Sequence, residues 1–356
     1  MPEPKPRHLG VDALRIVSML MVVGLHMYTE FGLQPHFSFK SPPGAAAWLL
    51  YLFMYCAANC FGMISGYVGV KQGFRPSKAL SLVLQVGFIH IAPHVIALLW
   101  RRSFSLRGLY QFMLTAPATY WYATAYFALL FFQPALSAAI QAMSRRQFRA
   151  LLVAMAILFC LLKGDPFHVQ EGFSTLWLIA MYFFGGYVRR FESEFRWKPW
   201  QYALAAGLTV AAEFASLAVS VLLRFPLDAY FVRYNSLPAL LCAFFLLLAF
   251  AKIRTAPRVP AAVTRYFAPA AFGVYLIHRQ PEIRALIERL SALCQISPSL
   301  LFLFPAACAF TLAVFLACAL VERLRLRLFR VLRIDRLPLW TERNLNQFIK
   351  RKELNP

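Results

Sequence analysis

The chain has 356 residues, of which 60% are hydrophobic, and its mean hydropathy is +0.58. Charged residues make up 15% of it, whereas a soluble domain carries about 25%. Several apolar runs reach the roughly 20 residues that a helix needs to cross a bilayer, so the composition excludes an ordinary soluble enzyme. The net charge is +22, but the basic residues stand in short clusters between apolar runs, which is typical of topology signals. We therefore expect an all-α, polytopic protein in contact with membrane lipid, and no nucleic-acid partner.

The seven cysteines lie mostly inside apolar runs. Their odd number and unpaired spacing argue against a disulfide framework and against a zinc site, so we expect no bound metal and no resident cofactor. The first eight residues are polar and lack a small-residue cleavage site, which predicts that the first apolar run stays in the protein as an anchor.

Ten apolar runs are predicted to be transmembrane helices. Two of them, the fifth and the ninth, are short, so nine or eleven spans are alternatives. The ten runs are residues 10–30, 46–70, 79–100, 120–142, 150–163, 172–188, 201–223, 236–252, 267–278 and 299–321. We expect one membrane domain over residues 10–322, between a cytoplasmic N-terminus (1–9) and a basic cytoplasmic tail (323–356).

The placement of Lys and Arg predicts the orientation. With ten spans and the N-terminus inside, 26 of the 37 Lys and Arg residues fall on the inner side and 10 on the outer side. Loops that remain in the cytoplasm carry the excess of basic residues, so both termini are predicted to be cytoplasmic.

The first span contains three ionisable residues, Asp12, Arg15 and His26. Arg15 and His26 are eleven residues apart, about three helical turns and about 16 Å along the axis, so both side chains point nearly the same way. Asp12 is one turn before Arg15, where the two can pair. Ionisable groups inside a span are costly and usually functional, although an interfacial ion pair and a structural histidine are the alternative interpretation.

Three later spans also carry candidate residues. The second span ends in small residues around Ser65 and is followed by a basic loop with Lys71, Arg75 and Lys78. Small residues there allow close approach of a helix or a ligand. The fourth span opens with an aromatic stretch in which Tyr122 and Tyr126 are one turn apart, where they form an interfacial belt or line a cavity. The ninth span ends at His278.

Five motifs, in this order along the chain, resemble those of acyltransferase family 3, a family of membrane proteins that modify extracytoplasmic glycans. The resemblance covers roughly residues 8–330, with Ile16 in place of the family's usual glycine. The motifs are Asp12, Arg15 and His26 in the first span; Phe61 to Tyr67; Tyr120 to Tyr126; Tyr234-Asn235-Ser236; and Val274 to His278.

The resemblance implies a membrane O-acyltransferase of the cytoplasmic (inner) membrane that moves an acetyl or similar acyl group from cytoplasmic acyl-CoA to a glycan hydroxyl outside. His26 would be the general base, because an imidazole with a pKa of about 6.5 suits proton transfer at neutral pH, and Arg15 and Asp12 would complete the catalytic set. Arg15, Ser65, Lys71, Arg75 and Lys78 would bind the acyl-CoA. The acceptor-binding residues would be Tyr122, Tyr126, Asn235 and His278. Direct transfer is preferred over an acyl-histidine intermediate.

Two alternatives use the same residues differently. A secondary transporter also places ionisable groups in its spans, but no inverted repeat and no pair of broken helices is visible in the sequence. An amino-sugar N-acetyltransferase would share the donor and differ in the acceptor group. Release of the CoA thiol by purified protein separates the enzymes from the transporter.

If both termini are cytoplasmic, single cysteines introduced at either end of a cysteine-free variant should stay unlabelled by a membrane-impermeant maleimide in intact cells. Both should react after the cells are opened. Ready labelling of either terminus from outside would refute the orientation.

Overall fold

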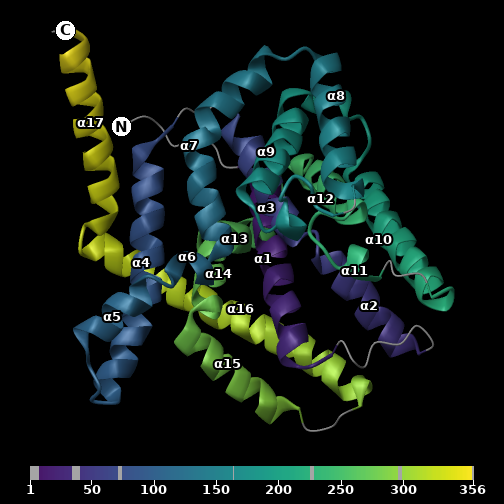
Figure 1. The fold of residues 1–356 in the computed structure, drawn as a ribbon, viewed down its shortest axis with the longest axis horizontal. Helices are drawn as coiled ribbons and strands as arrows, with labels where there is room; N and C mark the ends of the chain where they lie inside the picture. Colours follow the sequence, from purple (N-terminus) through teal and green to yellow (C-terminus); the bar gives the residue numbers. More distant parts are fainter. Residues whose placement is uncertain are drawn as a thin grey trace.

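A computed structural model describes residues 8–33, 41–70, 74–162, 164–224, 228–295 and 299–354. All regular structure in these ranges is helical, which confirms the all-α prediction (Figure 1). The α-helices are α1 (Leu9–Glu30), α2 (Pro42–Met54), α3 (Ala57–Gly69), α4 (Pro76–Trp100), α5 (Leu106–Met113), α6 (Ala116–Thr119), α7 (Trp121–Ala142), α8 (Arg145–Ala156), α9 (Thr175–Arg190), α10 (Pro199–Leu222), α11 (Asp228–Phe231), α12 (Leu237–Ala251), α13 (Arg258–Phe267), α14 (Ala271–Arg279), α15 (Pro281–Cys294), α16 (Leu300–Val331) and α17 (Leu337–Leu354). The five short helical turns between them are η2 (Ile157–Leu161), η3 (Gln170–Gly172), η4 (Glu192–Glu194), η5 (Ala268–Ala270) and η6 (Ile334–Arg336).

Six helical segments of the described chain are long and apolar enough to cross a bilayer: α1, α2 with α3, α4, α7, α10 and α16. The other four predicted spans coincide with shorter helices, namely α8 with η2, α9, α12, and η5 with α14. The protein is thus a multi-pass membrane protein, whereas the total of ten spans and the orientation stay predictions. We call the end of the molecule where α1 and α4 begin the N-terminal face, and the end where α1 and α14 finish the opposite face.

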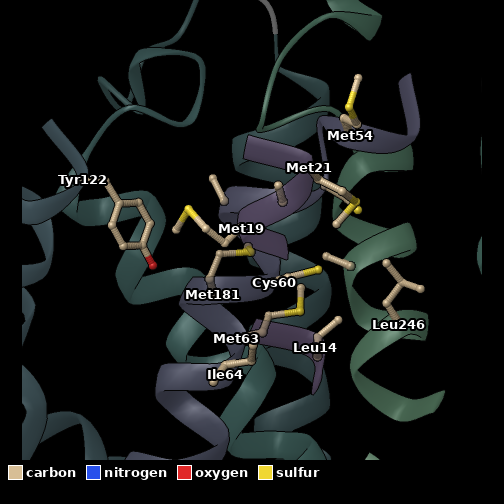
Figure 2. Packing of buried hydrophobic residues seen from close by; sticks show 14 of the residues in the cluster. Leu14, Met19, Met21, Met54, Cys60, Met63, Ile64, Tyr122, Met181 and Leu246 are labelled. Atoms are coloured by element: carbon tan, nitrogen blue, oxygen red, sulfur yellow. The ribbon is translucent and has the colours of Figure 1, made fainter. Parts of the chain in front are cut away.

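Helix α1 occupies the centre of the bundle, where it packs against α2, α3, α12, α13, α14 and α16 (Figure 1). Its surroundings explain how a spanning helix can carry ionisable groups, because protein and not lipid surrounds it. Sulfur-containing side chains fill much of the space between α1, α3 and α9, among them Met19, Met63 and Met181 (Figure 2). Unbranched methionines adapt to irregular gaps, and such gaps arise where helices cross at several angles.

The closest helix contact joins α3 to α9 through glycines on both helices. A Cβ atom on Gly66 would lie 2.0 Å from the carbonyl oxygen of Tyr182, and one on Gly185 would lie 1.8 Å from that of Met63. Small residues permit this backbone approach, which stabilises helix pairs by van der Waals packing when the surrounding solvent is lipid. The contact fixes α3, and with it Phe61 and Ser65, relative to the rest of the bundle.

The C-terminal part of the chain stays helical beyond the apolar run of the last predicted span. Helix α16 runs without interruption to Val331, so the predicted boundary at 322/323 falls inside it. Arg325, on the tail side of that boundary, is 8% exposed and forms a bidentate ion pair with Glu322 at 2.6 and 2.7 Å. After η6, α17 packs along α4 (Figure 1).

We predict that a methyl group introduced at the glycine contact between α3 and α9 lowers the stability of the protein. Gly185→Ala should destabilise the protein by about 1–3 kcal/mol, because backbone atoms of α3 have to move away from the new methyl group. Gly207→Ala is the matched control, since a Cβ at that exposed helical position meets no atom within 4 Å. The thermal unfolding midpoint of each variant in detergent compares the two, and equal midpoints would show that α3 and α9 do not depend on this approach.

Candidate active site

The polar stripe predicted on α1 faces two neighbouring cavities. Arg15 lines a large cavity of about 530 Å³ at the N-terminal face, and His26 lines a small one of about 30 Å³ nearer the opposite face. Arg15 forms an ion pair with Asp12, whose side chain is 5% exposed, so this charge pair stays inside the protein. The stripe therefore connects an ionic end with a histidine about 16 Å away along the helix.

The large cavity gathers cations and hydroxyl groups from separate parts of the chain. Arg15, Arg75 and Lys78 line it together with Ser65 and Tyr126. A volume of this size is in the range of cavities that hold a drug-sized or nucleotide-sized ligand. Lys71, the fourth predicted cation, lies outside the described residues.

Helix α17 supplies part of the wall of the large cavity. Leu339 lines the cavity, and Glu342, one turn later, forms an ion pair with Arg75 at 3.6 Å. The pair links the beginning of α4 to α17 beside the cavity. Nothing in the sequence connects Leu339 to this site, because it follows a long basic segment and belongs to no motif.

The small cavity is a nearly dry aromatic pocket around His26. Its walls include Trp121, Tyr234 and Tyr275, all of which approach from outside α1. By its volume it has room for about two water molecules. Three residues, Phe61, Tyr122 and Phe272, line both cavities and separate them. We call these three residues the aromatic constriction.

A hydrogen bond joins His26 to His278. The distance between His26 Nδ1 and His278 Nε2 is 2.8 Å, and His278 Nδ1 lies 2.7 Å from the carbonyl oxygen of Val274. A carbonyl only accepts, so His278 Nδ1 carries the proton and its Nε2 accepts in the neutral ring. His26 Nδ1 must then donate, which leaves the lone pair of His26 Nε2 free. Since His278 is 2% exposed while His26 is only half-buried, His26 is the member of the pair that a substrate can reach.

Helix α14, which carries His278, is held in place by the buried pair at the end of α16. A Cβ on Gly273 would lie 2.2 Å from Glu322 Cδ, so α14 and α16 touch closely at this point. Glu322 also accepts a hydrogen bond of 3.0 Å from Gln85, which lines the large cavity. Sequence reasoning missed Glu322, because an acidic residue beside an Arg-rich run resembles an exposed salt bridge.

The other predicted acceptor-binding residues, Tyr122, Tyr126 and Asn235, do not all line the same cavity. Tyr122 lies in the aromatic constriction, and Tyr126 lines only the large cavity. Asn235 lines neither cavity and donates a hydrogen bond of 2.9 Å to the carbonyl of Phe159. Its neighbour Tyr234 lines the small cavity instead, with its own carbonyl bonded to the buried Asn59 at 2.7 Å. The Tyr234-Asn235-Ser236 motif is therefore close to the small cavity, but Tyr234 and not the predicted Asn235 lines that cavity with His26.

A family model described as "Acyltransferase domain", that of acyltransferase family 3, matches residues 8–322. No curated protein and no solved structure gives a significant match to the chain.

Proposed function

Because the chain belongs to acyltransferase family 3 and is a multi-pass membrane acyltransferase, we propose that it transfers an acetyl group from acyl-CoA to a hydroxyl group of a glycan. In this proposal the N-terminal face is cytoplasmic, the opposite face is extracytoplasmic, and the protein resides in the cytoplasmic membrane. The observation that carries it is the free Nε2 of His26 behind a nucleotide-sized basic cavity.

The large cavity supports the binding of CoA. A CoA nucleotide is polyanionic, and the cations Arg15, Arg75 and Lys78 are grouped around one cavity. Arginine binds phosphate through two parallel hydrogen bonds, which suits a fixed nucleotide position. The pantetheine arm would then pass the aromatic constriction and bring the thioester to His26.

The His26–His278 pair supports general-base catalysis. His26 Nε2 takes the proton from the acceptor hydroxyl as its oxygen attacks the thioester carbonyl. The tetrahedral intermediate collapses with cleavage of the C–S bond, and the imidazolium returns the proton to the CoA sulfur. The products are the ester and CoA thiol. During the step, His278 Nε2 accepts from His26 Nδ1–H and so orients the ring and stabilises its positive charge.

Mass spectrometry of surface polysaccharide and glycolipid from cells with and without the gene tests the function. We expect acetyl esters that disappear with the gene, together with CoA release by the purified protein. Acetyl amides in place of esters would indicate an amino-sugar N-acetyltransferase. Absence of CoA release with envelope glycans as acceptor would contradict an acyltransferase reaction from CoA.

His26→Gln should lower the transfer rate by roughly 10²–10⁴-fold, because an amide keeps a hydrogen bond to His278 but takes no proton at neutral pH. Binding of acyl-CoA and the unfolding midpoint should change little, since the cations of the large cavity are untouched. Single-turnover transfer and equilibrium binding measure the two quantities. Near-normal transfer by a folded His26→Gln protein would remove His26 from the mechanism.

The small cavity supports a short acyl group. Its volume of about 30 Å³ has room for the methyl and carbonyl oxygen of an acetyl group but not for the two further methylenes of a butyryl group. Phe61 and Phe272 line this cavity, so their rings limit the size of the acyl group that fits beside His26. The constriction is therefore expected to select the acyl length.

Phe272→Ala should raise the ratio of kcat/KM for butyryl-CoA to that for acetyl-CoA by about 10–200-fold, the usual effect of a methylene or two in a fitted pocket. Phe131→Ala is the control, because Phe131 is 53% exposed and lines neither cavity. Rates with a series of acyl-CoA thioesters provide the measurement. An unchanged ratio would mean that another part of the chain sets the acyl length.

A further inference from the structure

Tyr275 is a buried tyrosine of α14 that lines the small cavity together with His26. It precedes His278 by three residues, so the two side chains lie on the same face of the helix. The centroid of its ring is 6.2 Å from that of His278, whose ring is in turn 5.0 Å from that of His26. Tyr275 is therefore a close neighbour of the proposed general base and of its partner.

A hydrogen bond holds the Tyr275 hydroxyl at the beginning of α7. The backbone N–H of Tyr122 donates to this hydroxyl at 3.3 Å. Tyr122 is in the first turn of α7, where backbone N–H groups have no partner within the helix. The bond therefore satisfies an otherwise unpaired donor, and it fixes the phenol oxygen at the positive end of the dipole of a 22-residue helix.

The hydrogen atom of the Tyr275 hydroxyl is left without an acceptor. A tyrosine hydroxyl can donate one hydrogen bond while its oxygen accepts another. The N–H of Tyr122 uses only the accepting side, and no group in the described part of the chain accepts a hydrogen bond from Tyr275. Because a hydroxyl donates more strongly when its own oxygen accepts a hydrogen bond, this arrangement prepares Tyr275 to donate to a ligand.

The proposed reaction requires such a donor in the small cavity. When the acceptor hydroxyl attacks the thioester, the carbonyl oxygen becomes negatively charged, and His26 Nε2 does not serve that oxygen because it takes the proton. No Lys or Arg of the described chain lines the small cavity, so hydroxyl or indole groups have to stabilise this charge. Among the four lining residues with such groups, Tyr275 alone has its polar side-chain atom held by a hydrogen bond to another described residue. The other three are Trp121, Tyr122 and Tyr234.

We propose that Tyr275 is a catalytic residue whose hydroxyl donates a hydrogen bond to the carbonyl oxygen of the thioester. This proposal rests on the proposed function and adds the group that stabilises its tetrahedral intermediate. Since the small cavity has room for about two waters, a carbonyl group inside it touches the residues of its wall. The hydrogen bond strengthens as the carbonyl oxygen gains negative charge, and it weakens when the C–S bond breaks and the C=O bond forms again. No proton leaves Tyr275, because the only proton that moves is the one that His26 carries from the acceptor to the CoA sulfur.

Tyr275→Phe removes the hydroxyl group and keeps the ring. We expect kcat for acetyl transfer to fall by about 10²–10³-fold, the usual effect of losing one oxyanion donor, while the affinity for acetyl-CoA changes little. Tyr230→Phe is the matched control, because the Tyr230 hydroxyl also accepts from a first-turn N–H, that of Leu237 in α12, at 3.0 Å. Tyr230 lines neither cavity, so its variant should keep the wild-type kcat although it loses the same kind of hydrogen bond.

Single-turnover rates and equilibrium binding of acetyl-CoA provide the measurement, and the thermal unfolding midpoint shows whether each variant is folded. A wild-type kcat in Tyr275→Phe, an equal fall of kcat in both variants, or a loss of affinity at unchanged kcat would overturn the proposal while the transferase function stands. Absence of acetyl transfer by the wild-type protein would remove the proposed function and the role of Tyr275 with it.

If Tyr275→Phe does not fold, infrared spectroscopy of the wild-type protein tests the same hydrogen bond. The probe is an unreactive ketone analogue of acetyl-CoA, in which a methylene group replaces the sulfur and the carbonyl carbon is isotope-labelled. We expect the carbonyl stretch of the bound analogue to lie at a lower frequency than in an aprotic solvent, because a hydrogen bond to the oxygen weakens the C=O bond. An unshifted band would show that no group donates to this oxygen and would overturn the proposal.

Discussion

Within a helix, each backbone carbonyl still has a second lone pair, and His278 uses that of Val274, four residues earlier in α14. This hydrogen bond requires no second charged side chain, which would be costly in a membrane interior. It fixes the proton of His278 on Nδ1, and the direction of every later hydrogen bond follows from it. Because the Val274 carbonyl ends this chain of hydrogen bonds, His26 donates from Nδ1 and keeps the lone pair of Nε2 free.

Besides the neutral His26–His278 pair, the site region contains two ion pairs. Asp12 pairs with Arg15 at the large cavity, and Glu322 pairs with Arg325 and accepts a hydrogen bond from Gln85, which lines that cavity. In both pairs the two opposite charges stand three residues apart, within one helix turn. The aromatic constriction lies between the large cavity and the small cavity that His26 lines. In the proposed reaction, the ionic part of the site would thus bind phosphates at a distance from the thioester.

Sequence periodicity and composition were enough to locate the helices at all ten predicted segments and to put Arg15 and His26 on one face of α1. These are local properties, set by the 3.6-residue repeat and by the length of apolar runs. The partnership of His26 with His278 spans 252 residues, and no repeat within either segment determines it. Phe272 in the constriction, Leu339 in the cavity wall and the buried Glu322–Arg325 pair were not predicted, because each depends on how α14, α16 and α17 pack and not on their own sequences.

The aromatic constriction has a consequence for the membrane as a whole. The protein has a cavity of about 530 Å³ at one face and a histidine near the other. If ions passed between the two, the membrane potential would be dissipated, and that potential is worth about 2.3 kcal/mol per charge at 100 mV. Phe61, Tyr122 and Phe272 leave space for about two waters beside His26, too few for a continuous column along which ions could move. In the proposed reaction, the same three rings narrow the path of the substrate arm and also insulate the two faces of the protein from each other electrically.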